Sequence, residues 1–258
     1  MFRKLLPRES SRLSLAIKNM AANLGYQDKL AEEEYFRREL VEMGRMDQSR
    51  QKHDPKSLEE RILDLADNLY SQGKLSEAEP FYRELVQRRS RRMPATHDDV
   101  LDAKSSLARV LADWAWMDRS NVTVASRSSE RAAEAEKILR ECLAVRLQGT
   151  NTGHWRISDV RSRLGGAMLS VAVTDRSLTE EARHARFAAI EPLLIQGHEG
   201  IMPRNSAPTR PKRGTFDRLI HLYEAWDKPG QAAEWRKKLA EFEAARRAKK
   251  IPVDDSAP

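Results

Sequence analysis

The sequence predicts an all-α protein in which about five helical hairpins stack on one another. The main observation is an internal repeat: "LGYQDKLAEEEYFRRELV" (residues 24–41) returns 45 positions later as "LYSQGKLSEAEPFYRELV" (residues 69–86). The alignment of residues 21–41 with 66–86 has 13 identities and no gap. The composition agrees, with 33% charged and 40% hydrophobic residues and only 11 Gly and 11 Pro among 258 residues. Such repeats are typical of solenoids, whose units bury their apolar faces against their neighbours.

Each repeat unit is predicted to contain two amphipathic helices. Apolar residues of the second copy recur at spacings of three and four, which places them along one face of a helix. They fall into two sets separated by "SQGK": Leu58, Ile62, Leu65 and Leu69, then Leu75, Ala78, Tyr82, Leu85 and Val86.

A tight turn is predicted between the two helices. Gly73 lies after the first set and suits the left-handed conformation that ends a helix. The equivalent residues are Asp28 in the first copy and Asp227 in a later one, and aspartate tolerates that conformation better than most residues. Ser76, followed by Glu79, predicts a capping box at the start of the second helix.

Three further hairpins follow along the chain. The third pairs "SLARVLADW" with "EAEKILRECL" across an insertion centred on "RSNVTVASRSS", which its Ser and Asn content predicts to be a surface loop. The fourth pairs "RSRLGGAMLSVAV" with "AAIEPLLIQGHEG" through a long connection, "TDRSLTEEARH", and the fifth is "RLIHLYEAWDKPGQAAEWRKKL". We therefore expect an N-terminal extension over residues 1–11, a solenoid over 12–247 and a disordered tail over 248–258.

The stretch "NLYSQGKLSEAEPFYRELV" resembles the tetratricopeptide repeat, in particular its kinesin-light-chain-like variant. The stretch from "ECLAVRLQGTNTGHWRISDVRSRLGGAMLSVA" through "EPLLIQGHEGI" to "RLIHLYEAWDKPGQAAEWRKKL" (residues 141–239) is also similar to the C-terminal repeat tails of large bacterial serine/threonine protein kinases. The resemblance implies a tetratricopeptide-type α-solenoid that acts as a protein-interaction scaffold. The chain departs from the pattern because its repeats are spaced more widely than the usual length of about 34 residues.

No motif indicates catalysis, a cofactor or a metal site. A Gly-rich kinase loop, a His-Arg-Asp or Asp-Phe-Gly motif, a nucleophile elbow and a zinc-binding H-E-x-x-H motif are all absent from the sequence. Cys142 aligns with the core position of Leu85 and is predicted to be a buried, inert thiol. The glycines of "LGG" (residues 164–166) align inside a first helix, which predicts close helix packing. We expect a protein that is not an enzyme.

The single cysteine and the absence of a long apolar run predict a cytoplasmic protein without a membrane partner. The formal net charge is +7, and basic residues cluster at residues 88–92, 210–213 and 245–250. These clusters keep open an alternative function, a basic helical-repeat protein that binds nucleic acid.

The leading hypothesis is that a partner protein or peptide binds in the concave groove that the family lines with the first helix of each hairpin. The residues of this sequence that correspond to the exposed groove positions of the family include acidic, basic and tyrosine side chains. This mixture suits a polypeptide partner. The predicted partner-binding residues are Lys18, Tyr26, Asp67, Tyr70, Asp102, Arg109, Asp113, Asp159, His221 and Glu224.

Overall fold

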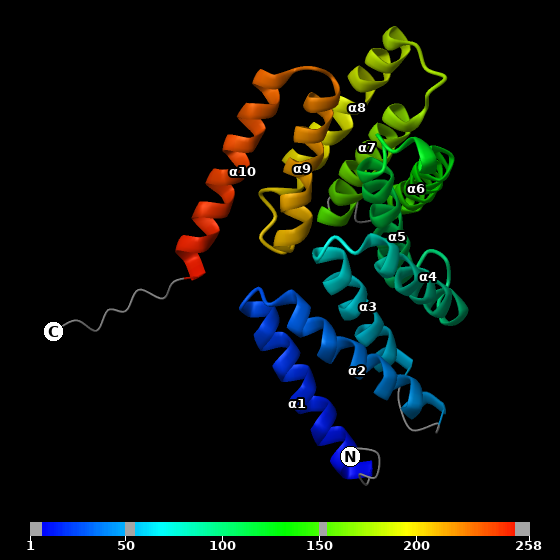
Figure 1. The fold of residues 1–258 in the computed structure, drawn as a ribbon, viewed down its shortest axis with the longest axis vertical. Helices are drawn as coiled ribbons and strands as arrows, with labels where there is room; N and C mark the ends of the chain where they lie inside the picture. The colour runs from blue at the N-terminus through cyan, green and yellow to red at the C-terminus, as the bar shows by residue number, and fades with distance from the viewer. Residues whose placement is uncertain (1–6, 50–54, 150–153, 251–258) are drawn as a thin grey trace, which may run out of the picture. The chain divides into compact units, whose positions relative to one another are not determined.

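The computed structural model describes residues 7–49, 55–149 and 154–250. In this part of the chain every regular element is a helix, with ten α-helices and one short 3₁₀ helix (Figure 1). The prediction of an all-α fold made of five successive hairpins is confirmed. The chain forms two compact units, Met1–Leu111 and Ala112–Pro258, which we describe separately.

The N-terminal unit contains two complete hairpins and the start of a third. Its helices are α1 (Pro7–Tyr26), α2 (Leu30–Ser49), α3 (Pro55–Ser71), α4 (Leu75–Arg92) and the first part of α5 (Asp98–Met117). Helix α2 packs against α1 and α3, and α3 packs against α4. Their apolar stripes meet in a core in which Ile17 and its repeat equivalent Ile62 are both buried.

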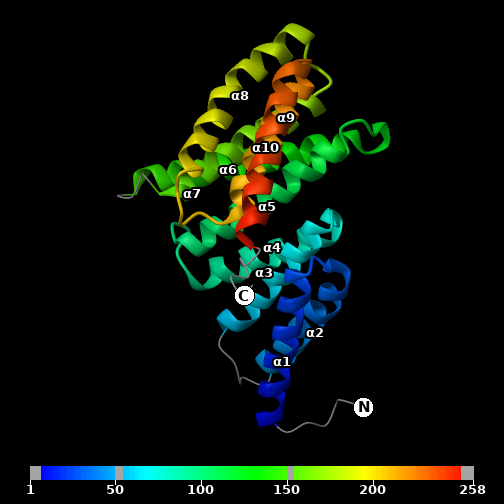
Figure 2. The ribbon, with the colours of Figure 1, turned by 90° about the vertical axis from the view of Figure 1, so that its left-hand side faces the viewer.

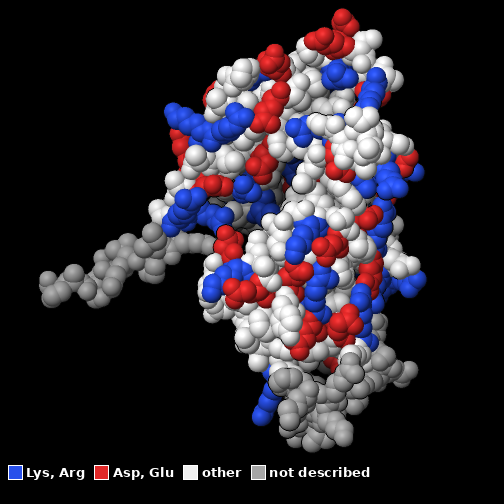
Figure 3. Space-filling model, in the orientation of Figure 1, with Lys and Arg blue, Asp and Glu red and all other residues white. Residues whose placement is uncertain are grey.

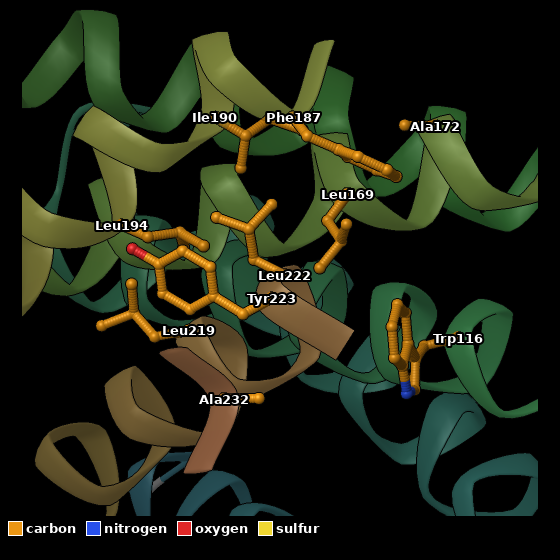
Figure 4. Packing of buried hydrophobic residues seen from close by; sticks show 10 residues of the cluster. All are labelled: Trp116, Leu169, Ala172, Phe187, Ile190, Leu194, Leu219, Leu222, Tyr223 and Ala232. Atoms are coloured by element: carbon orange, nitrogen blue, oxygen red, sulfur yellow. The ribbon is translucent and has the colours of Figure 1, made fainter. Parts of the chain in front are cut away.

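The C-terminal unit contains the rest of α5 and six further helices: η1 (Val122–Val124), α6 (Ala125–Gln148), α7 (Trp155–Thr174), α8 (Glu180–Ile201), α9 (Thr209–Ala225) and α10 (Pro229–Lys250). Helix α7 packs against α6, α8 and α9, and α10 packs against α9 (Figure 2). The core draws on five helices, α5 and α7 to α10, whose side chains converge around Phe187, Leu194 and Leu222 (Figure 4). Cys142 is buried, as its place in the repeat predicted.

The turns inside three hairpins share one backbone geometry, as the sequence predicted. Asp28, Gly73 and Asp227 have φ angles of 62°, 74° and 54°. In each turn the following lysine donates its backbone N–H to the carbonyl five residues earlier, at 3.0, 3.0 and 2.9 Å. This bond closes the first helix and reverses the chain, so that the second helix returns alongside the first.

Gly73→Val is expected to lower the free energy of unfolding by about 1–2 kcal/mol, because a β-branched residue is strained in the left-handed region. A Cβ at this position meets no atom within 4 Å, so the effect reports backbone strain alone. Gly73→Asn is the matched control and is expected to cost about half as much or less. Urea unfolding followed by circular dichroism measures both variants, and equal losses would contradict the strain argument.

The predicted capping box at the start of α4 is wrong. The helix begins at Leu75, so its N-cap is Lys74, which makes no side-chain capping bond. Glu79 instead forms an ion pair with Arg83 one turn later. The tight turn at Gly73 starts the helix two residues earlier than the sequence pattern implies.

The predicted loop around "RSNVTVASRSS" is mostly helical. After a turn in which Asn121 accepts a bond from the Thr123 N–H (3.1 Å), α6 begins at Ala125. Arg131 explains this extension, since its guanidinium lies over the Trp114 ring (3.5 Å from Cζ to the centroid) and binds Asp118 (3.1 Å). Packing against α5 therefore outweighs the low helix propensity of the serines.

The long connection predicted in the fourth hairpin is also shorter than expected. Helix α8 begins at Glu180, and the Thr179 hydroxyl caps it by accepting a bond from the Ala182 N–H (3.2 Å). Glu180 and Glu181 lie in the first turn, where negative charge is favourable. The segment "TEEAR" is thus a capped helix start.

At the two ends, α1 begins at Pro7, within the predicted extension, and α10 continues to Lys250. The tail predicted to be disordered lies, from residue 251 on, outside the described residues. None of the helices described is both long and apolar enough to cross a membrane.

Candidate protein-binding surfaces

Three of the predicted partner-binding residues meet in one cluster of the N-terminal unit. Arg109 on α5 donates from Nη2 to Oδ1 of Asp67 (3.2 Å), and its guanidinium lies over the Tyr70 ring, with Cζ 3.9 Å from the centroid. The hydroxyl of Tyr82 on α4 donates to the same Asp67 oxygen (2.5 Å) and accepts a bond from Arg109 (3.1 Å). The cluster joins α3, α4 and α5 and fixes the orientation of Asp67 and Tyr70.

A second carboxylate, Asp64, lies one turn before Asp67 on α3 and was not predicted. Arg37 of α2 binds it (2.6 Å), and the positive charges of Arg37 and Lys18 both act on it. Burial raises the pKa of Asp64, while Arg37 and Lys18 oppose that rise and Asp67 adds to it. Lys18 of α1 therefore faces the same side of the unit as the two aspartates of α3.

The remaining predicted residues of this unit differ in exposure. Lys18 is exposed, and Tyr26, at the end of α1, is 83% exposed. Asp102 is half-buried on α5, two turns before Arg109. Arg109 itself is only 6% exposed, so the expectation that it is an exposed groove residue is wrong. We call Lys18, Tyr26, Asp64, Asp67, Tyr70 and Asp102 the first-helix surface, since all of them lie on α1, α3 or α5.

Another group of predicted residues gathers in the C-terminal unit. The His221 ring of α9 stacks on Trp116 of α5, with centroids 4.4 Å apart and an interplanar angle of 15°. Burial lowers the pKa of His221, although Asp113, Glu224 and Asp217 act in the opposite direction. Burial therefore favours the neutral form of this ring, which lies among carboxylates. Trp116 was the partner that sequence reasoning missed.

Asp159 does not join this group. It is 5% exposed and lies just after the first turn of α7, where it forms an ion pair with Arg163 (2.7 Å). The prediction of an exposed groove position is wrong here because α7 is enclosed by α6, α8 and α9 and exposes little of its length.

The glycines of "LGG" do allow close helix packing. A Cβ on Gly165 would lie 2.6 Å from Leu194 Cδ2, and one on Gly166 would lie 2.8 Å from Arg218 Cδ. Helices α8 and α9 therefore approach α7 at these two residues, and the segment is not a phosphate-binding loop.

The first basic run is engaged in ion pairs. Arg88 binds Glu84 (2.8 Å), Arg92 binds Glu59 (2.7 Å), and Arg89 donates to the Asp99 carbonyl (2.9 Å). On the face shown in Figure 3, basic and acidic side chains are interspersed. This arrangement does not favour a polyanion as the partner. Among the described residues, no group of three or more His, Cys, Asp and Glu side chains could hold a metal ion.

Comparisons with known proteins agree with the fold. Residues 60–99 match the family model of the tetratricopeptide repeat. The structure is similar to the tetratricopeptide-like repeats of a putative kinesin light chain from Podosopora anserina, whose crystallised form carries one substitution. The TM-score is 0.54 and the identity is 16%, and the match covers 93% of this chain and 98% of that one. It is also similar to BtubC (BKLC) from P. vanneervenii, with a TM-score of 0.54 and 17% identity over 97% of this chain and 92% of that one. A search of curated proteins found no match.

The chain thus has a tetratricopeptide-like repeat fold, similar to that of kinesin-light-chain-like repeats, and residues 60–99 match the tetratricopeptide repeat itself. The prediction made from the repeat sequence is confirmed. The further likeness to bacterial kinase tails stays a prediction.

Proposed function

We propose that this chain is a protein-interaction scaffold without catalytic activity, and that a partner protein or peptide binds to the first-helix surface of the N-terminal unit. Repeat proteins of this fold type are non-catalytic interaction scaffolds. The single buried cysteine favours a reducing cytoplasm as its location.

The observation that carries the proposal is the fixed orientation of polar and aromatic groups on α3. Asp67 and Tyr70 are held by Arg109 and Tyr82, and Asp64 is held by Arg37. A partner that binds preordered side chains loses less conformational entropy than one that must order them. Because the surface carries both signs of charge beside tyrosine rings, a mixed-sequence polypeptide fits it better than a uniformly charged polymer.

Tyr26→Ala is expected to weaken partner binding by about tenfold, since an exposed tyrosine at a binding surface contributes about 1–2 kcal/mol. The matched control is Tyr35→Ala, which removes a tyrosine that is 68% exposed on α2, away from the first-helix surface. The partner is first identified by in-cell cross-linking to the full chain and mass spectrometry. Its affinity for each variant is then measured by calorimetry. Equal loss in both variants, or loss only in the control, would place the binding elsewhere.

A further inference from the structure

Helix α3 shows how one hairpin of this chain docks on the hairpin before it. Its leucines Leu58, Leu65 and Leu69 lie on one face and are buried. The close approach of α2 is visible at Gly44, where a Cβ would lie 2.9 Å from Leu58 Cδ1. The apolar part of the docking surface is therefore a leucine stripe covered by the second helix of the preceding hairpin.

The same face of α3 also carries polar donors that bind the first turn of α2. Asn68 Nδ2 donates to the Leu30 carbonyl (3.0 Å) and to Glu33 Oε2 (2.9 Å). Gln72 Nε2 donates to the Leu30 carbonyl (3.2 Å) and to Glu34 Oε2 (2.8 Å). The donors of α3 thus bind one backbone carbonyl and two consecutive carboxylates at the start of the covering helix.

The donors form a favourable site for a carboxylate. Although burial raises the pKa of Glu34, bonds from Lys74, Arg38 and Gln72 lower it to about 2. Lys74 contributes a bond of 2.6 Å to the same carboxylate. The acidic turn of α2 is therefore recognised chemically as well as by shape.

Helix α1 carries the same stripe 45 positions earlier, but there it faces outward. Leu13, Met20 and Leu24 replace the three leucines, while Asn23 and Gln27 repeat the two amide donors. Met20 is 51% exposed, whereas Leu65, its equivalent in α3, is 1% exposed. Asn23 and Gln27 are also exposed. Leu13 and Leu24 are half-buried, so this face has the composition of a docking surface and is open around Met20, Asn23 and Gln27.

The sequence of α10 shows that the last hairpin of a second copy does not complement this face. Alignment through the turn residues Asp28 and Asp227 places Ala232 and Ala233 where α2 has its two glutamates. A head-to-tail contact between copies would therefore leave the amide donors without carboxylates. The chemistry indicates a different protein as the occupant.

We propose that the outer face of α1 docks an amphipathic helix of a partner protein that begins, as α2 does, with two consecutive glutamates. The carboxylates bind Asn23 and Gln27, and the apolar side of the helix covers Leu13, Met20 and Leu24. The apolar side of this outer face, Leu13, Met20 and Leu24, lies on the other side of α1 from Lys18 and Tyr26, while Asn23 lies at its edge, one turn before Tyr26.

The probe is a fluorescent synthetic peptide of residues 28–49, held helical by a lactam bridge that joins Arg38→Lys to Glu42. Titration with the full chain, followed by fluorescence anisotropy, is expected to show saturable binding. A peptide with Glu33→Gln and Glu34→Gln is expected to bind about tenfold more weakly, because it loses two charge-assisted hydrogen bonds. Met20→Glu in the chain is expected to weaken binding by at least about tenfold, since it places a charge under the apolar side of the helix.

Leu15→Glu is the matched control, because Leu15 is also an apolar residue of α1, is 59% exposed and lies on the opposite side of the helix. This variant is expected to bind as the wild type does. Circular dichroism verifies that both variants stay folded. Absence of binding to the wild-type chain would overturn the proposal. Loss of binding in Leu15→Glu alone would place the peptide on the first-helix surface. Unchanged binding in both variants would indicate that the peptide exchanges with the chain's own α2. Either of these results would also overturn the proposal.

Discussion

Arg109→Ala is expected to lower the free energy of unfolding of the N-terminal unit by about 2–4 kcal/mol, because the loss of one partner from a buried ion pair leaves the other charge without compensation. Arg109 is buried and binds both Asp67 and Tyr82. The partial exposure of Asp67 keeps the expected loss below that of a fully buried pair. The cation–π contact with Tyr70 is lost as well.

Hydrogen-exchange mass spectrometry measures this loss locally, in peptides from α3 and α4. Tryptophan fluorescence is the internal reference, since all five tryptophans belong to the C-terminal unit: Trp114, Trp116, Trp155, Trp226 and Trp235. Arg109→Lys keeps the charge but lacks the planar guanidinium group and its several donors. It is therefore expected to restore less than half of the stability that Arg109→Ala loses. Protection of α3 and α4 that is unchanged in Arg109→Ala would show that the cluster contributes nothing to folding.

The framework of the fold could be predicted from the sequence because its signals are local. Gly73, Asp28 and Asp227 mark the turns, and the leucine spacing marks the buried faces on both sides of them. The predictions failed where tertiary contacts decided the outcome. Arg131, for example, extends α6 through a serine-rich stretch by packing on Trp114, a contact between residues that the sequence does not place together.

The sequence predicted the positions of the candidate site residues much better than it predicted their burial and their contacts. Repeat alignment selected Asp67, Tyr70 and Arg109 separately, and the structure joins them. The alignment did not show that Arg109 is buried or that the hydroxyl of Tyr82, which reads as an apolar core residue, completes the cluster. A buried polar group is recognised by its partners, and those partners come from different helices.

Gly197→Ala is expected to lower the free energy of unfolding of the C-terminal unit by about 2–3 kcal/mol, whereas Gly200→Ala, three residues later on α8, is expected to be neutral or to raise it by up to about 1 kcal/mol. A Cβ on Gly197 would lie 2.6 Å from Ser162 Cβ, 2.8 Å from Ser162 N and 2.9 Å from the Ser158 carbonyl of α7. Two of these atoms are backbone, so the helices must separate to accommodate the methyl group.

At Gly200 the nearest atom to an added Cβ is the Ser158 hydroxyl, at 2.3 Å, and a hydroxyl at the end of a side chain moves away by rotation. The next atom, Ser158 Cβ at 3.1 Å, has to shift by only a few tenths of an ångström, so alanine gains its higher helix propensity at a small steric cost. Urea unfolding followed by tryptophan fluorescence measures both variants, because it reports on the C-terminal unit alone. Effects of equal sign and size would contradict the close packing of α7 on α8. A lower free energy of unfolding in Gly197→Ala, without such a loss in Gly200→Ala, would show that α8 needs glycine at position 197 because the backbone of α7 lies so close there.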